Sequence, residues 1–548
     1  MGAIDIVLAM LLALVASSLL VRALPVAIPT PLVQIGLGAL IAMFSDDAVR
    51  LDPDIFFVLF LPPLLFLDGW RIPKEGLLRD KGMILELALG LVFLTVIGMG
   101  LFIHWLIPPM PMPVAFALAA IVSPTDPVAV SAITSRIPVP RRLQHVLEGE
   151  SLLNDASGLV CFRFAVAAAL TGVFSLQAAA LTFLWLAVGG LAIGVGLTAG
   201  ILLLKNLITQ RFGEESGSQV VISLLLPFAA YLAAEHLHCS GILAAVSAGV
   251  TMSYMELTGH AQGSTRTQRT AVWDTVQFVL NGVMFVLLGE QLPGILERSA
   301  NAMHETDHNN PAWLAVYVLA INLGLAVLRF VWVWGSLRLG AWLAMLRGET
   351  PGAPPRLRLV AAMSVAGVRG AITLAGVLTL PLTLADGSPF PARDLTIFLA
   401  AGVIIFSLLA ANLALPRLLR SLNMPDDHPE AEGLEHARVT ASEAAMRAIQ
   451  RRVEAHAVAP EEADLHAEAV ERTLDHYRRR IDGERGSSAS VLRARRGNQI
   501  ERELRLEGLQ AERDALYALA RAQRLPDDLS RRLVREIDLL EERLKHEA

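Results

Sequence analysis

The chain has 548 residues, of which 54% are hydrophobic and 18% are charged, and its formal net charge is −6. Soluble domains carry about 25% charged residues, so this composition argues against a wholly soluble protein and favours a membrane protein. The chain contains only two cysteines, Cys161 and Cys239, and each lies in or beside an apolar run. A disulfide framework is therefore disfavoured.

Apolar runs follow one another through the first 420 residues. A helix needs about 20 mostly apolar residues to cross a bilayer, and by this measure the chain has about thirteen candidate spans. The sequence therefore predicts an all-α polytopic membrane protein with a transmembrane domain over residues 1–420. In chain order, the candidate spans are residues 4–21, 27–44, 55–70, 83–107, 114–133, 150–170, 178–204, 219–236, 240–256, 273–291, 312–334, 358–380 and 395–419.

Basic residues gather in alternate loops between these spans. Loops rich in Lys and Arg stay on the cytoplasmic side of a membrane. The alternation predicts a multi-pass protein of the cell (inner) membrane with its N-terminus outside and its C-terminal tail in the cytoplasm. The basic positions are Arg22 and residues within 71–81, 136–142, 205–211, 266–269 and 338–358, and the intervening loops hold only Arg50, Arg298 and Arg393.

Two of the predicted spans are interrupted. The fifth contains Pro124 and Pro127, and the twelfth contains glycines on both sides of Arg369. Proline removes a backbone donor and disfavours helix in the residue before it. The offsets of the two breaks fit two halves of six spans, with the span at 178–204 between them. This pattern predicts inverted repeats with two broken helices that cross near the bilayer midplane, as in secondary transporters.

The last part of the chain, residues 421–548, is rich in charged residues and poor in apolar ones. Apolar positions recur there at spacings of three and four, which predicts a helical cytoplasmic tail arranged as a hairpin or a short coiled coil. The tail has no glycine-rich phosphate loop, and its charges mix both signs, which argues against nucleic-acid binding. The predicted helices are Ala441–Glu454, Pro460–Ile481, Gln499–Arg521 and Asp528–Lys545, with breaks at Asp482–Ser490 and Leu525–Asp528.

A first carboxylate, Asp126, lies between the two prolines of the fifth span. A charge within a span costs roughly 2.5–3.5 kcal/mol on insertion scales, so such residues are functional candidates. Unwound backbone at Pro124 and Pro127 exposes carbonyl groups that can bind a cation, and Thr125 adds a hydroxyl. The alternative is a proline kink in which Asp126 caps the half-helix that follows. We favour the functional interpretation, because a cap alone is more often found at the membrane edge.

A second carboxylate, Asp155, lies in the sixth span, and three polar side chains precede it: Glu150, Ser151 and Asn154. The spacings of four residues within this group bring all of them to one side of a helix. Their oxygen atoms suit Na⁺ or Li⁺ rather than a soft metal. The alternative is the start of a cytoplasmic helix, which fits the first residues of the stretch better than it fits the deeper Asp155. We predict that Asp126 and Asp155 together bind a small monovalent cation or protons, one kind at a time.

Arginines also fall within predicted spans, where a charge needs a partner; they include Arg329, Arg369 and Arg163, and the sequence indicates no partner for Arg163. We pair Arg329 with Glu150 as a buried ion pair, which leaves Asp155 able to exchange protons. Arg369 is expected to neutralise carbonyl ends where the two broken helices cross, although the sequence fits the swapped pairing as well. Asp68 lies near the end of a span, and its position is equally consistent with an interfacial cap and with a place on the ion path.

Four motifs carry a family resemblance: Leu61-Pro-Pro-Leu-Leu-Phe66, Ser123-Pro-Thr-Asp-Pro-Val-Ala-Val130, Glu148-Gly-Glu-Ser-Leu-Leu-Asn-Asp-Ala-Ser-Gly158 and Gly367-Val-Arg-Gly-Ala-Ile-Thr373. They resemble motifs of the bacterial sodium/proton exchangers of the first monovalent cation:proton antiporter family, and the likeness extends over about residues 1–420. The Asn-Asp pair with its upstream Glu-Ser is highly specific. The charged tail resembles that of the long bacterial members.

The resemblance implies an antiporter that exchanges Na⁺ (or Li⁺) for H⁺ in pH and sodium homeostasis. It also implies thirteen spans and a homodimer with a mobile core domain and a dimer-forming domain. We expect the transported ions and no resident cofactor. Relatives that move net charge have a second aspartate at the position of Asn154, so electroneutral exchange is implied. The implied site consists of Asp155 as the principal carboxylate, Asp126, Thr125 and Ser151 as further ion ligands, and Asn154 and Glu150 in support.

Other functions fit parts of the sequence. The same fold could exchange K⁺ for H⁺, because oxygen ligands do not separate the two cations. A cation channel is disfavoured by the pair of broken helices and by the lack of a filter loop. A membrane sensor would use the charged tail as its output, but the tail has no kinase or nucleotide motif. An enzyme is disfavoured because no nucleophile–base arrangement or metal cluster appears.

Overall fold

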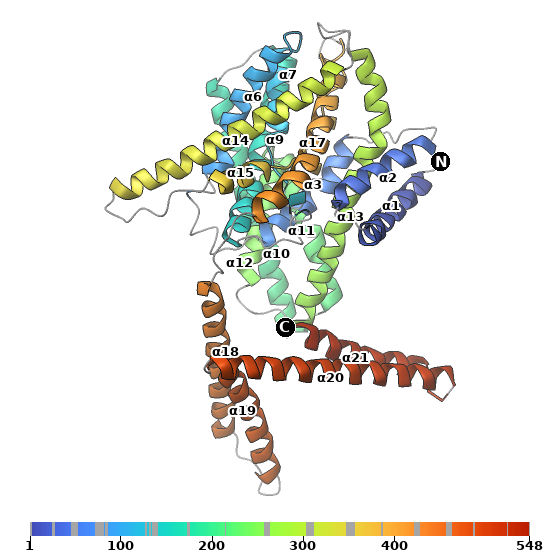
Figure 1. Ribbon diagram of the computed structural model, residues 1–548, viewed down its shortest axis with the longest axis vertical. Helices are drawn as coiled ribbons and strands as arrows, with labels where there is room; N and C mark the ends of the chain where they lie inside the picture. Colours follow the sequence, from blue (N-terminus) through green and yellow to red (C-terminus); the bar gives the residue numbers. More distant parts are fainter. Residues whose placement is uncertain are drawn as a thin grey trace. The chain divides into compact units, whose positions relative to one another are not determined.

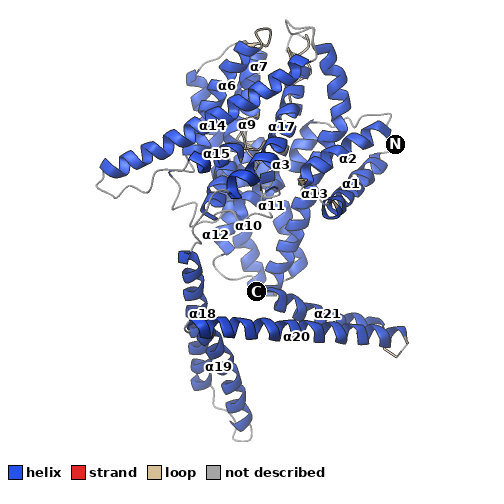
Figure 2. Cartoon of the chain, viewed as in Figure 1, coloured by secondary structure: helices blue, strands red, loops and turns tan. Residues whose placement is uncertain are grey.

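The structure is a computed structural model whose described residues divide between two compact units, Met1–Met424 and Pro425–Ala548. In these residues the regular structure is helical, apart from an isolated bridge between Thr383 and Pro389 (Figure 2). The predicted all-α class is therefore confirmed. The described residues are 3–24, 28–44, 53–71, 82, 86–126, 129–130, 133, 141–172, 176–213, 215–256, 263–302, 312–346, 357–384, 387–420, 428–455, 463–485, 488–522, 524–525 and 527–546.

The first unit is a bundle of mostly apolar helices (Figure 1). In chain order its helices are α1 (Ala3–Ala23), α2 (Thr30–Phe44), α3 (Pro53–Arg71), the π-helix η1 (Glu86–Leu91), α6 (Val92–Leu106), α7 (Met112–Ile121), α9 (Arg141–Thr171), α10 (Leu176–Phe212), α11 (Ser216–His236), α12 (Gly241–Glu256), α13 (Gly263–Ala302), α14 (Ala312–Leu346), α15 (Leu357–Val365), α16 (Ala371–Leu378) and α17 (Arg393–Arg420).

In the part of the chain that the structure describes, six helical segments are long and apolar enough to cross a membrane. Shorter apolar segments occur in α1, α2, α7 and α9. These lengths support a multi-pass membrane protein, and the count of about thirteen crossings stays a prediction. The six long segments are Leu89–Leu106, Leu184–Phe212, Ser216–His236, Thr265–Arg298, Ala312–Leu339 and Arg393–Arg420.

Several helices extend well beyond the apolar runs that predicted them. α9 begins at Arg141, whereas the predicted span began at residue 150, and α13 covers Gly263–Ala302 rather than 273–291. Hydropathy marks only the part of a helix that lies in hydrocarbon, and the backbone hydrogen bonds continue into the polar headgroup region. The basic residues at the start of α9 therefore belong to a helix and not to a loop.

Neighbouring helices approach each other closely at glycines. A Cβ atom on Gly38 of α2 would lie 1.9 Å from the Val286 carbonyl oxygen of α13. One on Gly249 of α12 would lie 2.0 Å from the Phe66 carbonyl oxygen of α3. Small residues let membrane helices pack backbone to backbone, and this packing replaces the hydrophobic effect as the source of association. The contacts hold α2 on α13 and α3 on α12.

The two spans that were predicted to be broken are broken in the structure. α7 ends at Ile121, and non-helical residues follow it up to Asp126, after which residues 129–130 are helical again. α15 and α16 are separated by non-helical residues 366–370. Proline and glycine explain both interruptions, because proline cannot donate a helical hydrogen bond and glycine disfavours helix by about 1 kcal/mol.

The second unit consists of helices that pack in pairs, α18 with α19 and α20 with α21. Val534 and Ile537 of α21 and Leu509 of α20 are buried. Arg513 of α20 forms ion pairs with Asp538, at 2.9 Å, and with a second carboxylate of α21. The bounds of these helices are α18 (His428–Ala455), α19 (Ala463–Arg485), α20 (Ser488–Arg521) and α21 (Asp527–His546).

The break predicted at Asp482–Ser490 is wrong in its extent. α19 continues to Arg485, and α20 begins at Ser488. The prediction gave too much weight to Gly483, since one glycine costs a helix only about 1 kcal/mol. The charged residues beside it are good helix formers and offset this cost.

We predict that Gly38→Ala destabilises the first unit and that Gly36→Ala, on the same helix, does not. The methyl group at position 38 would overlap a backbone oxygen, so a helix must move, and we expect a loss of about 1–3 kcal/mol. Among the described residues, no atom beyond the neighbouring backbone of α2 lies within 4 Å of a Cβ at position 36, and alanine favours helix over glycine. Thermal unfolding of the purified proteins measures the difference. Equal stability of the two variants would contradict the close packing of α2 on α13.

Candidate functional site

The two non-helical stretches bind each other through their backbones. The Asp126 N–H donates to the Val368 carbonyl oxygen at 2.8 Å. Arg369 lies at this crossing, where Nε donates to the Val122 carbonyl at 2.9 Å and Nη1 donates to the Gly367 carbonyl. Both carbonyls lie just beyond the C-terminal ends of helices, which carry partial negative charge. Arg369 therefore contacts the carbonyl ends that we expected it to neutralise, and the neutralising role stays a prediction.

Two glycines allow this crossing to form. A Cβ atom on Gly370 would lie 1.8 Å from Asp126 Oδ2. A Cβ atom on Gly158 of α9 would lie 2.6 Å from the Pro124 side chain. A larger residue at either position would displace the group it faces, so the proline-flanked stretch depends on both glycines for its position.

Thr125 is held by two side chains of α9. Ser151 Oγ donates to the Thr125 carbonyl at 2.8 Å, and Asn154 Nδ2 donates to Thr125 Oγ1 at 2.9 Å. Asn154 Oδ1 is buried and accepts no hydrogen bond from the described residues. Ser151 and Asn154 are not among the residues that line the adjacent pocket. Their contacts fix the backbone and the hydroxyl of Thr125, which does line it.

Arg329 and Glu150 form the ion pair that we expected from the sequence. Arg329 Nη2 lies 2.6 Å from Glu150 Oε2, and Nη1 contacts the other carboxylate oxygen, so the pair is bidentate. The Arg329 side chain is 3% exposed and the Glu150 side chain is fully buried. Arg329 Nε also donates to the Met363 carbonyl at 2.9 Å. The pair thus joins α9 to α14 and α15 and compensates the charge of Glu150.

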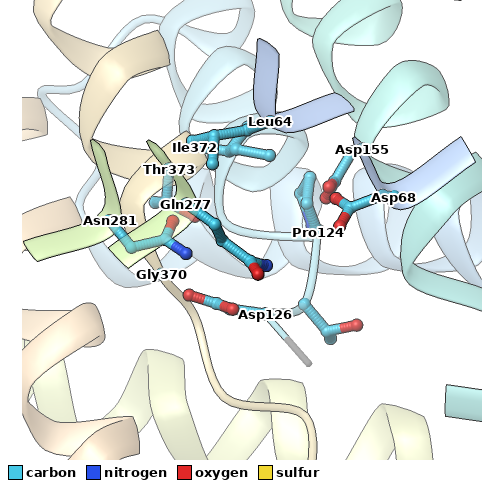
Figure 3. Close-up of a pocket in the computed structure, with 11 residues that line it drawn as sticks. Leu64, Asp68, Pro124, Asp126, Asp155, Gln277, Asn281, Gly370, Ile372 and Thr373 are labelled. Atoms are coloured by element: carbon cyan, nitrogen blue, oxygen red, sulfur yellow. The ribbon is translucent and has the colours of Figure 1, made fainter. Parts of the chain in front are cut away.

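Three carboxylates line one pocket beside the crossing. Asp68 comes from α3, Asp126 from the break after α7 and Asp155 from α9. Figure 3 shows the Asp68 and Asp155 carboxylates pointing toward each other. The cavity has a volume of about 30 Å³, room for about two waters or a cation that has lost most of its hydration shell. The other lining residues are Leu64, Pro124, Thr125, Gln277, Asn281, Gly370, Ile372 and Thr373.

The pocket concentrates negative charge. Asp155 is 3% exposed, and it is repelled by the charges of Asp68, Asp126 and Glu150. A cation or a proton in the pocket offsets part of this repulsion, which is strong where water is excluded. Asp126 Oδ1 also accepts a hydrogen bond from the Ala129 N–H at 3.1 Å. The side chain therefore caps the next half-helix, as the alternative interpretation proposed, and lines the pocket as well.

Hard oxygen ligands dominate the pocket. Besides the three carboxylates it has the side chains of Thr125, Thr373 and Asn281 with their oxygen atoms, whereas the Gln277 amide oxygen accepts a hydrogen bond from Arg71. Oxygen ligands of this kind suit alkali-metal cations. Within the described residues no three His, Cys, Asp or Glu side chains form a compact group that could hold a metal ion.

Sequence reasoning missed Gln277, Asn281 and Thr373. Gln277 and Asn281 are four residues apart in α13, so they share one face of the helix. Two amides at this spacing within an apolar span are the signal that could have found them. Asp68, for which the sequence left two alternatives, lies in the pocket with them.

Comparison with known proteins decides the family. The family model described as sodium/hydrogen exchanger, transmembrane, matches residues 7–421. The chain belongs to the sodium/hydrogen exchanger family. This exchanger is therefore a cation/proton antiporter, a membrane transporter and not an enzyme.

Individual relatives agree with this assignment. The exchanger is 40% identical over 541 residues to the uncharacterised Na(+)/H(+) exchanger YjcE of Escherichia coli K12, and the match covers 98% of this chain and 97% of YjcE. It is 45% identical over 410 residues to the sodium, potassium, lithium and rubidium/H(+) antiporter of Bacillus pumilus, covering 74% of this chain and 60% of that protein. The solved structure of the sodium proton antiporter MjNhaP1 from Methanocaldococcus jannaschii shares the fold, with a TM-score of 0.56 at 19% identity over 76% of this chain and 99% of that one.

We predict that Arg329→Ala and Glu150→Ala each destabilise the exchanger by about 3–5 kcal/mol, because each leaves an uncompensated buried charge. The double variant should be more stable than either single one. Arg505→Ala serves as the matched control, since Arg505 of α20 forms an exposed ion pair with Glu501 at 2.6 Å and such pairs contribute about 0–1 kcal/mol. Folded yield and melting temperature are the readouts. A double variant no better than the single ones would show that the pair does not act as a unit.

Proposed function

We propose that this protein exchanges Na⁺ or Li⁺ for H⁺ across the cell membrane by competition at Asp155. One observation carries the proposal: a carboxylate that is 3% exposed shares a pocket with two others beside the crossing of two broken helices. Burial penalises an uncompensated charge, so such a group holds either a proton or a metal cation. Alternating access of the pocket to the two sides of the membrane then carries whichever ion is bound.

The proposed cation ligands are Asp155, Asp126, Thr125 and Ser151. The first three line the pocket, which supports direct contact with the ion. The Ser151 hydroxyl donates its proton to the Thr125 carbonyl, and this leaves the lone pairs of its oxygen as acceptors for a cation. Asn154 has a supporting role because it orients the Thr125 hydroxyl.

Electroneutral exchange is part of the proposal. The residue beside Asp155 is Asn154, and an amide does not take up a proton as a second aspartate would. One acidic group then alternates between one proton and one monovalent cation. We further propose that the protein is a homodimer in the cell membrane with its tail in the cytoplasm. The distribution of basic residues between alternate loops supports this orientation.

Potassium is the second candidate for the exchanged cation. The Bacillus pumilus relative, at 45% identity, is named as an antiporter of sodium, potassium, lithium and rubidium. Carboxylate, hydroxyl and amide oxygens bind all of these ions, and a cavity with room for about two waters admits K⁺ as well as Na⁺. We put Na⁺ and Li⁺ first because the matching family model is that of sodium/hydrogen exchangers.

We predict that Asp155→Asn abolishes Na⁺-driven proton movement in proteoliposomes, because an amide of the same shape neither binds a proton nor compensates a cation. The variant should insert and fold normally, since it removes charge repulsion from the pocket. Asp394→Asn provides a control, because Asp394 is a half-exposed carboxylate of α17 that pairs with Arg393. A dye that reports internal pH measures exchange. Exchange retained by the Asp155 variant would rule out the assignment.

We predict that Na⁺ and Li⁺ support exchange at lower concentrations than K⁺ and Rb⁺. The test is a series of cation pulses on the same proteoliposomes over a range of pH. Because one positive charge is exchanged for another, a membrane potential imposed on the vesicles should leave the initial rate unchanged. A K⁺ response as strong as the Na⁺ response would replace our first choice of cation, and a rate that follows the potential would contradict electroneutrality.

A further inference from the structure

A polar stripe connects the pocket with the end of α3. On α3, Asp68 lines the pocket and Arg71 lies three residues further on, at the last position of the helix. On α13, Asn281 and Gln277 line the pocket and Asp274 lies three residues before Gln277. Residues three and four apart share a helix face, so polar groups of both helices continue outward from the pocket.

Arg71 joins the two sides of this stripe. Its Nη1 donates to Gln277 Oε1 at 2.7 Å, and its Nη2 forms an ion pair with Asp274. The Arg71 side chain is 38% exposed and the Asp274 side chain is 58% exposed, so the pair lies where the pocket approaches solvent. The amide oxygen of Gln277 is therefore bound by Arg71, while the Gln277 side chain also lines the pocket.

This contact decides which atoms of Gln277 are available to an ion. A side-chain amide has one oxygen acceptor and two N–H donors. While Arg71 holds the oxygen, the N–H groups are left for the carboxylates of the pocket, and Figure 3 shows the Gln277 amide reaching toward Asp126. Alkali cations bind oxygen and are repelled by N–H donors. The held amide thus competes with a cation for the same carboxylates.

Contacts of Phe66 and Trp70 hold the last turns of α3 before Arg71, so we assign any rearrangement to the side chains of Arg71 and Gln277. Trp70 Nε1 donates to Glu256 Oε2 of α12 at 2.9 Å, and the Arg269 guanidinium of α13 pairs with the same glutamate. That guanidinium also lies over the Trp70 ring, 5.2 Å from its centroid. Phe66 stacks on Trp273 with a centroid distance of 5.3 Å. These contacts hold the end of α3 against α12 and α13.

We propose that Arg71 is a positioning residue that lowers the affinity of the pocket for its cation by holding Gln277 Oε1, with Asp274 as the counter-charge. When the Arg71 contact is absent, Gln277 turns its oxygen into the pocket and becomes a cation ligand. The inference rests on the proposed cation exchange for the identity of the ion. It assigns a role to Arg71, Asp274 and Gln277.

The test compares Arg71→Met, Gln277→Leu and the double variant with the unmodified full-length protein. The matched control is Arg505→Met, which removes an exposed arginine from an ion pair with Glu501 within α20. Two readouts are collected for each protein: the apparent KM and maximal rate of Na⁺-driven exchange in proteoliposomes, and the stabilisation of the purified protein by NaCl against a choline chloride reference. If Gln277→Leu yields no folded protein, Gln277→Met replaces it.

We expect Arg71→Met to lower the apparent KM for Na⁺ about fivefold with little change in maximal rate, since it frees an oxygen ligand and removes a nearby positive charge. In the Gln277→Leu background the same change should alter KM by less than about twofold, because only the screened charge effect remains. The NaCl midpoint of stabilisation should shift in parallel. Arg505→Met should change neither readout.

An unchanged KM in Arg71→Met, or a full fivefold effect in the Gln277→Leu background, would overturn this inference and leave the proposed exchange intact. If the unmodified protein shows no exchange but NaCl stabilisation responds to Arg71 through Gln277, the proposed exchange fails and the positioning role stands. If neither readout responds, both are overturned.

Discussion

Peptide groups that leave a helix inside a bilayer must find partners other than water, and this constraint governs the centre of the membrane unit. Two non-helical stretches, one after α7 and one between α15 and α16, lie next to each other, and each supplies hydrogen-bond partners for the backbone of the other. The Asp126 N–H finds the Val368 carbonyl, and the Arg369 guanidinium binds carbonyls of both stretches. The hydrogen bonds that satisfy this backbone also place Asp126 at the pocket. The same break in the helix therefore creates part of the candidate site.

The charges around this crossing are of two kinds. Glu150 is bound on both oxygens by Arg329, and in a buried bidentate pair of this type removal of either partner is costly because it leaves the other charge uncompensated. Asp155, five residues later on α9, lies in the cavity with like charges around it. A single helix thus presents one carboxylate that is permanently compensated and one that depends on a transported ion for compensation. Competition between a cation and a proton needs only the carboxylate of the second kind, Asp155.

The sequence alone was enough to predict those site residues that are unfavourable in an ordinary membrane-spanning helix. Charged residues within apolar runs, and prolines or glycines within spans, are individually costly, so Asp126, Asp155 and Arg369 stand out without a structure. The need to compensate buried charge led us to pair Arg329 with Glu150, but the sequence fitted the swapped pairing as well, and the structure shows which arginine binds Glu150. Amides cost less to bury than charges, so the pair of Gln277 and Asn281 is a weaker signal, and the contact of Gln277 with Arg71 is visible only in the structure, where α3 and α13 meet. The full lengths of α9 and α13 could not be predicted either, because hydropathy describes the preference of side chains for lipid or water and not the hydrogen bonding of the backbone.

Gly370 shows how a residue without a side chain can govern a charged one. A single added carbon there would overlap the carboxylate of Asp126. The absence of a side chain at Gly370 therefore determines where this carboxylate can lie. In a genetic screen, substitutions at position 370 would therefore give the same phenotype as substitutions of Asp126. A map of loss-of-function positions alone would suggest that Gly370 takes part in ion binding, although its role is to leave room for the carboxylate.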